Sequence, residues 1–507
     1  MGKENKAENR VASDPSDSKK KASVAQKASV IIASKAITIV ARITSIMVLT
    51  RVLTKEDFGL LSFVLLAYTT VTTLSQLGLP DSVFYFFERV PPKSRKSLAL
   101  QTGRLLFGIG LLGSMLLVVL TFLAPLWGFE VGGLFLPLIL LALLELPTTP
   151  IPNILIAIDR TKQAAWFNII VSVTLFSATV VPAVLGLNLY AIVYCLAGYG
   201  VVRFCVAGWL LTRNFRGRGG PLPDGMLRQQ LGYSVPLGLA QILWSLNRVI
   251  DKYIVASFLP VAVFVEYTVG AWEIPLIPMI AYSVAAVMMP DFVAAHLKGD
   301  TKNLMDLWFQ SIRKVAIIVL PATVLFLLIA TEFIAVFFSE NYMSAALPFR
   351  IYTVILFIRV TSYSSILKAI GDTRSVTRQA IYLLLLNVAF SIPLVQMWGV
   401  AGPPTATLAA NLITWVYFLA RIRTGLRVEF KQVFPFAFYF KALGVAIVAA
   451  APAYFIAQLL TLSYGSALLV KLVLYVASYA SVSLLTGITT KKDWQFIGGL
   501  VGFKSKK

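Results

Sequence analysis

Basic side chains stand inside apolar segments that are long enough to cross a membrane, and their spacing gathers them on helix faces. Between residues 28 and 50, Lys35, Thr38 and Arg42 are followed by Ser45, in steps that return to one side of a helix. Charged groups at such depth usually face a cavity or a partner. Ammonium and guanidinium groups attract anions, and the planar guanidinium fits phosphate oxygens.

A second polar face falls between residues 231 and 258. Its members are Ser234, Gln241, Ser245, Arg248 and Lys252. Asp251 lies three residues from Arg248, a spacing that allows the two to pair on a helix.

Further charges lie in the following apolar segments. Glu266 and Glu273 share one helix face, and Arg359 stands near the middle of its segment. We expect five residues to bind an anionic substrate: Lys35, Arg42, Arg248, Lys252 and Arg359. We expect the carboxylates of Asp251, Glu266 and Glu273 to bind a coupling ion or line a cavity. The alternative for both groups is a set of internal salt bridges between helices.

The composition is that of an integral membrane protein. The 507 residues are 58% hydrophobic and only 13% charged, whereas about a quarter is charged in soluble domains. A single histidine, His296, and two cysteines leave almost no material for His/Cys metal sites or a Ser-His-Asp triad. We therefore expect neither an enzyme nor a cofactor. The outer loops are too short to hold a catalytic site.

Fourteen helical spans are predicted: 28–50, 58–86, 98–123, 132–158, 164–186, 190–212, 231–258, 261–290, 308–331, 344–368, 376–397, 401–420, 433–460 and 466–487. With the N-terminus inside, the cytoplasmic segments carry 31 lysines and arginines and the outer loops carry Arg51 and Lys55 alone. This bias follows the positive-inside rule and predicts two cytoplasmic termini in the cell membrane. The net charge of +22 is thus explained by topology, without nucleic acid.

Two short turns repeat along the chain. Ala157–Lys162 reads AIDRTK and Ala369–Arg374 reads AIGDTR, and 369 − 157 = 212 residues separate them. Both turns are cytoplasmic and six spans apart, so the two copies are parallel. Position 248 also falls opposite Arg42 in the repeat. The fold class is therefore all-α, with two six-helix lobes related by a parallel pseudo-twofold axis and two additional C-terminal helices.

The expected segments follow from these spans. They are a disordered cytoplasmic tail (1–27), an N-terminal six-helix lobe (28–212), a cytoplasmic linker (213–230), a C-terminal six-helix lobe (231–420), two extra transmembrane helices (421–487) and a basic cytoplasmic tail (488–507).

Three motifs resemble those of bacterial polysaccharide flippases. Arg51–Leu60 (RVLTKEDFGL) is similar to the first-loop motif, Asp251–Val255 (DKYIV) to the span-seven motif, and Ala369–Thr373 (AIGDT) to the turn after span ten. The chain departs from the family at Lys252, where arginine is usual, and at Val265, where glycine is usual. The family lies in the superfamily of multidrug exporters, oligosaccharide-lipid flippases and the lipid II flippase.

The resemblance implies a function. Polysaccharide members move undecaprenyl-diphosphate-linked oligosaccharide across the cytoplasmic membrane by alternating access, so the substrate and membrane lipid are the expected partners. A proton or a sodium ion is the candidate coupling ion, and glycosyltransferases and a polymerase are candidate protein partners. Two alternatives stay open: a lipid II flippase and a cation-coupled exporter of small molecules.

Overall fold

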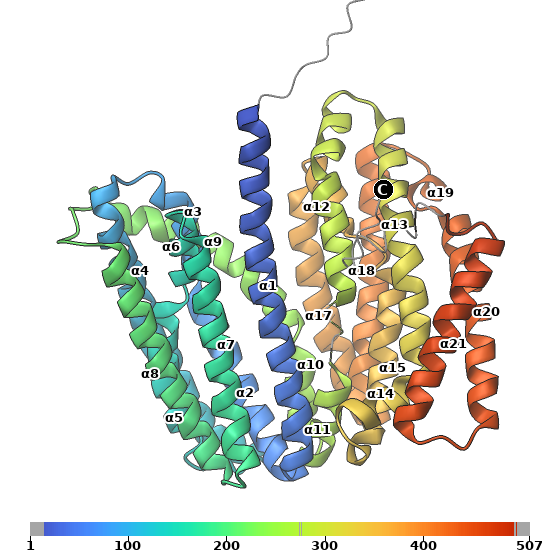
Figure 1. Cartoon of the computed structure of the whole chain (residues 1–507), viewed down its shortest axis with the longest axis horizontal. Helices are drawn as coiled ribbons and strands as arrows, with labels where there is room; N and C mark the ends of the chain where they lie inside the picture. Colours follow the sequence, from blue (N-terminus) through green and yellow to red (C-terminus); the bar gives the residue numbers. More distant parts are fainter. Residues whose placement is uncertain (1–14, 273, 275, 491–492, 494–507) are drawn as a thin grey trace, which may run out of the picture. The chain divides into compact units, whose positions relative to one another are not determined.

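A computed structural model describes residues 15–272, 274, 276–490 and 493. Every regular element within those residues is a helix (Figure 1). Twelve helical segments are long and apolar enough to cross a membrane. Helices suit the hydrocarbon interior of a membrane because each helix satisfies its own backbone hydrogen bonds. The predicted all-α membrane architecture is confirmed.

The number of spans is less simple than the predicted fourteen. One apolar segment, Thr373–Leu426, contains two helices, α17 (Thr373–Trp398) and α18 (Gly402–Leu426), joined by the short turn η6 (Gly399–Ala401). The region of the expected spans seven and eight is divided into shorter helices. These are α9 (Met226–Asn247), α10 (Ile250–Phe258), α11 (Val261–Gly270) and α12 (Leu276–Leu297). The count of fourteen therefore stays a prediction.

The described chain divides into two compact units, each made from separate stretches of sequence. The first contains the described residues up to 46, then 74–118 and 133–238; the second contains 47–73, 119–132 and the described residues from 239 onward. Four boundaries fall inside helices, namely α1 (Pro15–Val52), α2 (Lys55–Gln76), α4 (Arg95–Leu123) and α9. The lobes expected at 28–212 and 231–420 stay a prediction.

The first unit packs short and long helices around an apolar core. Its remaining elements are α3 (Leu79–Phe87), η1 (Pro92–Ser94), α5 (Phe135–Glu145), η3 (Leu146–Thr148), α6 (Ile151–Ala157), α7 (Thr161–Val184) and α8 (Leu189–Asn214). Helix α8 packs against α5 and α7, and α3 packs against α6. Phe87 and Phe167 are fully enclosed in this core.

Two glycines let α9 cross the break between α2 and α3 within the first unit. Gly78 adopts a φ of +69°, and a Cβ there would lie 2.6 Å from the carbonyl oxygen of Ser234. A Cβ on Gly238 would lie 2.3 Å from the backbone carbon of Leu77. Only hydrogen fits at either position, so the two backbones meet directly.

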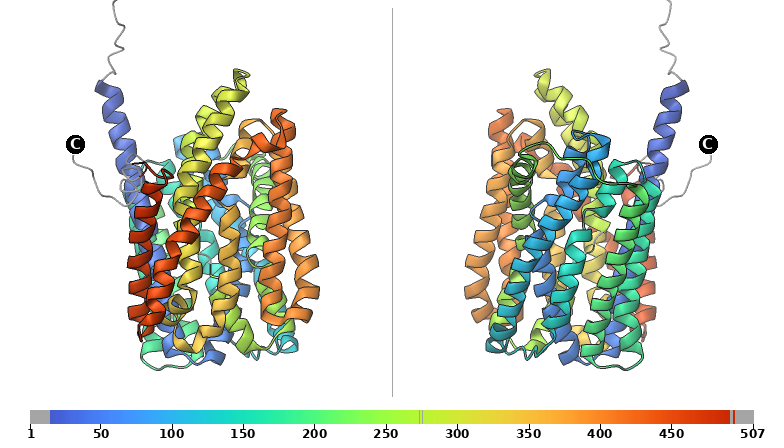
Figure 2. Two further views of the ribbon diagram at one scale, coloured as in Figure 1. Left: turned by 90° about the vertical axis from the view of Figure 1, so that its right-hand side faces the viewer. Right: turned by 90° about the vertical axis from the view of Figure 1, so that its left-hand side faces the viewer.

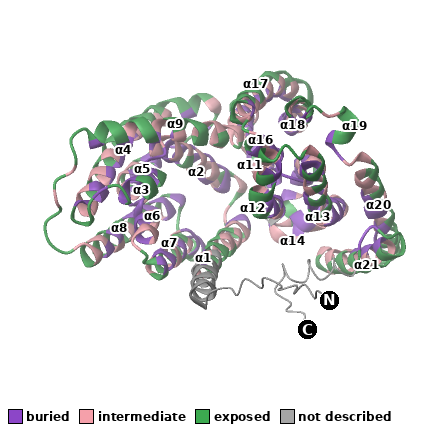
Figure 3. Cartoon of the chain, turned by 90° about the horizontal axis from the view of Figure 1, so that it is seen from above, coloured by how far each residue is buried: buried purple, intermediate pink, exposed green. Residues whose placement is uncertain are grey.

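The second unit contains the longer set of elements. They are η2 (Ala124–Trp127), α13 (Thr301–Leu328), α14 (Ala330–Phe337), η4 (Glu340–Ala345), α15 (Ala346–Ile355), η5 (Leu356–Ile358), α16 (Tyr363–Ala369), α19 (Phe430–Val433), α20 (Phe436–Leu459) and α21 (Tyr464–Leu485). Helices α20 and α21 form a hairpin (Figure 2), which packs against α13 and α14. Their outer faces are exposed (Figure 3), as expected for side chains that meet lipid.

The repeated turn has the same backbone hydrogen bonds in both copies. In the first, the amides of Asp159 and Arg160 donate to the carbonyl oxygens of Ile156 (3.0 Å) and Leu155 (2.7 Å). In the second, the amides of Gly371 and Asp372 donate to Lys368 (3.1 Å) and Leu367 (2.8 Å). All four donors and acceptors thus match at the predicted separation, in the pattern of a Schellman motif. Asp159 (φ 60°) and Gly371 (φ 84°) both occupy the left-handed region.

The helices before the two turns are also broken in the same way. Helix α5 passes through η3 into α6, and α15 passes through η5 into α16. Sequence periodicity marks the faces of helices but not such interruptions. The agreement of breaks and turns supports the duplication inferred from the two short motifs.

Asp372 fastens the second turn to its neighbouring helix. Its Oδ1 caps α17 by accepting from the amide of Ser375 (3.2 Å), and its Oδ2 accepts from Arg421 Nη2 (2.8 Å). Partial desolvation opposes ionisation of this carboxyl, but the hydrogen bonds from Arg421 and Ser375 outweigh it and lower the pKa of Asp372. The α17–α18 hairpin is therefore fixed at this end by a charged group.

Candidate functional site

A buried carboxylate lies in the second unit, directly after a helix break. Asp251 is 5% exposed and stands in the first turn of α10. Its Oδ1 accepts from the Lys252 amide (2.8 Å), and its Oδ2 accepts from the hydroxyls of Tyr267 (2.7 Å) and Tyr352. The two hydroxyls are 2.6 Å apart. Three helices, α10, α11 and α15, thus converge on one carboxylate.

These contacts replace the pairing that the sequence spacing suggested. Within the described part of the chain, the partners of the Asp251 carboxylate are the two tyrosines and the Lys252 amide, not Arg248. The first turn of a helix favours a negative charge, and phenol donors hold it in place. A carboxylate so arranged can take up a proton or a small cation. The tyrosines were missed from sequence because an isolated tyrosine in an apolar segment gives no signal.

Buried polar groups on α17 and α18 lie in the same unit. Asn387, which is 1% exposed, donates to Thr407 (3.1 Å) and accepts from Ser391 (2.9 Å). Helix α18, which carries Thr407, packs against both α10 and α15, which carry Asp251 and Tyr352. The polar groups around Asp251 therefore extend onto α18. Buried polar groups in a membrane protein either form a structural hydrogen-bond network or line a solute pathway.

Two of the expected anion-binding arginines stand where helices are interrupted. Arg248 lies between α9 and α10, is exposed, and holds its guanidinium 5.7 Å from the ring centre of Trp244. Arg359 follows η5 at the break before α16 and is partly exposed. Lys252, in the first turn of α10, is also partly exposed. Non-helical backbone at membrane depth occurs where it is enclosed by protein or lines a water-filled cavity.

The other two expected residues lie on α1 in the first unit. Lys35 and Arg42 are both exposed. Thr38, which the spacing put on the same face, instead meets Ser172 of α7, with 2.6 Å between their hydroxyl oxygens. The predicted polar face of α1 therefore has two parts: Thr38 contacts α7, whereas Lys35 and Arg42 are exposed.

The first-loop motif is held within the second unit. Arg51 donates to the carbonyl oxygens of Met47 (2.6 Å), Phe337 (3.0 Å) and Val336, and so caps the end of α14. Lys55 Nζ pairs with Glu266 Oε1 at 2.9 Å. The two outer charges that depart from the positive-inside rule are thus held by contacts within this unit. Glu273 lies outside the described residues.

The family departure at position 265 also has a local explanation. Val265 packs against Gly59, where a Cβ would lie 2.6 Å from Val265 Cγ2. Gly59 thus provides the space that the larger residue at 265 occupies.

One further charge cluster belongs to the first unit. Arg203 donates to Glu145 (2.6 Å), to the Tyr199 hydroxyl (2.9 Å) and to Thr148 (2.8 Å). The contacts join α8 to the α5–η3 break. A satisfied cluster of this kind positions helices, and nothing in the sequence pattern predicts its partners.

Comparison with known proteins identifies the family. The family model described as "Polysaccharide biosynthesis protein" matches residues 24–296, and that described as "Lipid II flippase MurJ" matches residues 239–475. No curated protein matches the sequence.

Solved structures show the same fold. A lipid II flippase MurJ in an inward closed conformation is similar with a TM-score of 0.66 and 15% identity, over 90% of this chain and 98% of that one. An inward-facing multidrug resistance MATE family transporter gives 0.59 and 16%, over 77% and 96%. A transporter from Pyrococcus furiosus, described as having a binding pocket of reverse polarity, gives 0.52 and 14%, over 79% and 95%. Because the first family model spans more than half of the residues, the chain belongs to the family described as polysaccharide biosynthesis protein.

Proposed function

We propose that this protein moves undecaprenyl-diphosphate-linked oligosaccharide from the inner to the outer leaflet of the cytoplasmic membrane, by alternating access, for surface polysaccharide biosynthesis. The proposal rests on one observation: a chain of this family carries lysine and arginine side chains within its apolar, membrane-spanning segments. Such residues are costly in lipid and are retained where an anionic solute or a partner uses them. A diphosphate is an anion that arginine binds through paired N–H donors.

The substrate-binding residues are those expected from sequence: Lys35, Arg42, Arg248, Lys252 and Arg359. Three of them, Lys35, Arg42 and Arg248, are exposed in the structure. Arg248 and Arg359 stand at helix interruptions, where a water-filled cavity can be lined by irregular backbone. Both observations support a role in binding a solute.

Asp251 is the proposed site of ion coupling, with Glu266 and Glu273 as the other acidic candidates. Its burial in an apolar, membrane-spanning part of the chain supports this role, because ionisable residues at such depth mark ion pathways. Glu266 already has a cationic partner in Lys55, which makes it the weaker candidate.

A lipid II flippase is the second candidate function, because the corresponding family model matches residues 239–475. Its substrate also carries a diphosphate, so the sugar attached to the carrier distinguishes the two. A cation-coupled exporter of small molecules is the third, since a multidrug transporter shares the fold. Cationic drugs require an acidic cavity, and the excess of basic residues opposes that function.

The proposed location is the cell membrane, with both termini cytoplasmic. The lysine and arginine bias of the connecting segments supports this orientation. Glycosyltransferases and a polymerase of the same pathway are the proposed protein partners, since they supply and consume the lipid-linked sugar.

Native mass spectrometry of the purified protein tests the substrate. Wild type and the Arg42→Ala and Arg248→Ala variants are incubated with polyprenyl-diphosphate-sugar, lipid II and a cationic dye. We expect selective retention of the diphosphate-sugar, reduced about tenfold or more in each variant, since hydrogen bonds to charged groups contribute about 1.5–3 kcal/mol. Arg104→Ala is the matched control, because Arg104 is also exposed but lies near a span end.

Flipping of a fluorescent diphosphate-sugar lipid in liposomes then tests transport. The two variants should be slow and the control normal. Retention of the dye with no diphosphate-lipid binding would reject the flippase function in favour of an exporter. Stronger retention of lipid II than of the oligosaccharide lipid would favour the second candidate.

A further inference from the structure

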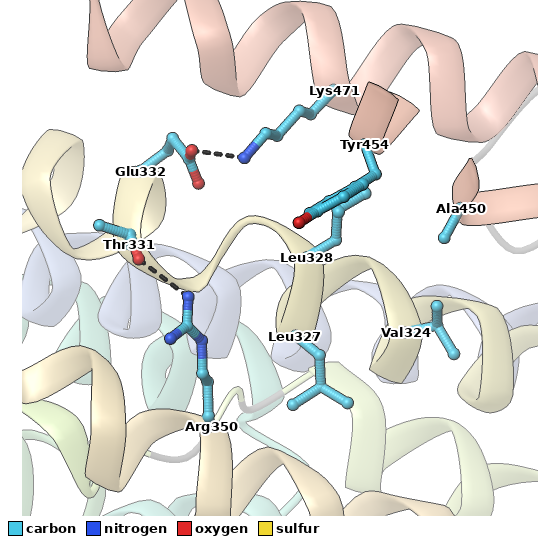
Figure 4. Close-up of a pocket in the computed structure, with 9 residues that line it drawn as sticks. All are labelled: Val324, Leu327, Leu328, Thr331, Glu332, Arg350, Ala450, Tyr454 and Lys471. Carbon is cyan, nitrogen blue, oxygen red and sulfur yellow. Dashed lines mark hydrogen bonds and ion pairs between the residues drawn. The ribbon is translucent and has the colours of Figure 1, made fainter. Parts of the chain in front are cut away.

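A pocket of about 400 Å³ opens within the second unit, and none of the candidate site residues considered so far lines it. Five helices contribute to it: α13, α14, α15, α20 and α21 (Figure 4). Its volume suits a lipid headgroup and is at the small end for ligand pockets, so it does not hold an oligosaccharide.

The pocket has a charged side and an apolar side. Arg350, Lys471 and Glu332 approach it from three different helices, beside the hydroxyls of Thr331 and Tyr454 (Figure 4). Its apolar lining comes from Val324, Leu327, Leu328 and Ala450. An amphipathic ligand would meet matching chemistry on both sides.

One of the three charges remains available to a ligand. Lys471 Nζ pairs with Glu332 Oε1 at 2.5 Å, and both side chains are nearly buried, with 14% and 13% exposed. Arg350 is exposed, and its partner within the described residues is the Thr331 hydroxyl, at 3.0 Å from Nη2. A guanidinium carries five N–H donors, so most of them stay accessible. The lining residues together carry one net positive charge.

The depth of the pocket fits the headgroup region of a bilayer. Arg350, Tyr454 and Lys471 all lie about one to two turns from the helix ends next to the α20–α21 loop. The lipid-facing sides of that hairpin are apolar, with Val448, Phe455 and Val473 all exposed. A phosphate on Arg350 would therefore leave acyl chains free to run along α20 and α21.

We propose that this pocket binds an anionic phospholipid of the surrounding membrane, with its phosphate on Arg350 and the start of an acyl chain against Leu327, Leu328 and Ala450. The Lys471–Glu332 pair forms one wall and keeps the α20–α21 hairpin attached to α14. In the orientation proposed above, the bound lipid belongs to the outer leaflet. The site is independent of the transported substrate.

Native mass spectrometry of the delipidated full chain tests the site. The ligands are phosphatidylglycerol, phosphatidylcholine, diacylglycerol, polyprenyl monophosphate and inorganic phosphate alone. We expect phosphatidylglycerol to be retained most strongly. Arg350→Gln should reduce its retention about tenfold, which corresponds to one charged hydrogen bond of about 1.4 kcal/mol. Arg374→Gln, an exposed arginine at the start of α17, is the control and should bind like wild type.

A second variant separates binding from folding. Ala450→Phe fills the apolar side and leaves every charge in place, so it should also lower retention while the melting temperature stays near that of wild type. Equal retention by Arg350→Gln and Arg374→Gln would overturn the proposal. So would equal binding of diacylglycerol, inorganic phosphate or polyprenyl monophosphate, because each of these removes the need for a phospholipid.

Discussion

The hydrogen bonds on Asp251 give a measurable prediction. Tyr267→Phe removes one hydroxyl from a side chain that is fully buried, and with it one of three donors to the carboxylate. Phenylalanine fills the same space, so no cavity is created. With the carboxylate ionised, loss of this bond should lower the free energy of unfolding by about 1.5–3 kcal/mol.

A double-mutant cycle isolates the contribution of the Asp251 charge to this hydrogen bond. In an Asp251→Asn background the same change removes a neutral hydrogen bond, which contributes about 0.5–1.5 kcal/mol, so a coupling of about 1 kcal/mol is expected. The measurement is unfolding in denaturant in mixed micelles, with Tyr382→Phe as the control because Tyr382 is 44% exposed. Equal losses in both backgrounds, or a loss no larger than the control's, would refute a charged carboxylate held by the tyrosines.

Three further outcomes follow from local geometry. Gly238→Ala should lower the free energy of unfolding by about 1–3 kcal/mol, as overpacking does, because its Cβ would meet the Leu77 backbone; a thermal melt without a shift would contradict the contact. Gly371→Ala should cost about 1–2 kcal/mol from φ alone, since a Cβ there meets nothing within 4 Å; melting compared with wild type measures it. The lowered pKa of Asp372 means that its pairing with Arg421 adds stability above about pH 4, the usual carboxyl range, and loses it as the pH falls further. Melting of Asp372→Asn should therefore converge with wild type at low pH, and a constant gap would contradict the sign.

Local sequence patterns predicted much of the fold. Long apolar segments predicted a helical membrane protein, and the AIDRTK and AIGDTR turns predicted a repeat whose backbone hydrogen bonds agree in the structure. Turns are readable because a few neighbouring residues determine them. The break between α9 and α10 was not predicted, because it consists of Arg248 and Val249 and contains neither proline nor glycine.

The candidate site was only partly predictable. Asp251 stood out because a charge in an apolar segment is unusual, but its partners Tyr267 and Tyr352 come from other helices. Helical spacing reports which residues share a face and not which helix lies opposite. The pairing of Lys55 with Glu266 was equally hidden, since 211 residues separate them.

That long separation has a consequence for biosynthesis. Residues 47–73 belong to a unit whose other members come mostly after residue 238. At a synthesis rate of about 5–20 residues per second, Glu266 emerges about 10–40 s after Lys55. During that interval α2 is inserted without the carboxylate and without the α14 end that Arg51 caps. The contacts of Arg51 and Lys55 therefore cannot form until more than half of the chain has been synthesised.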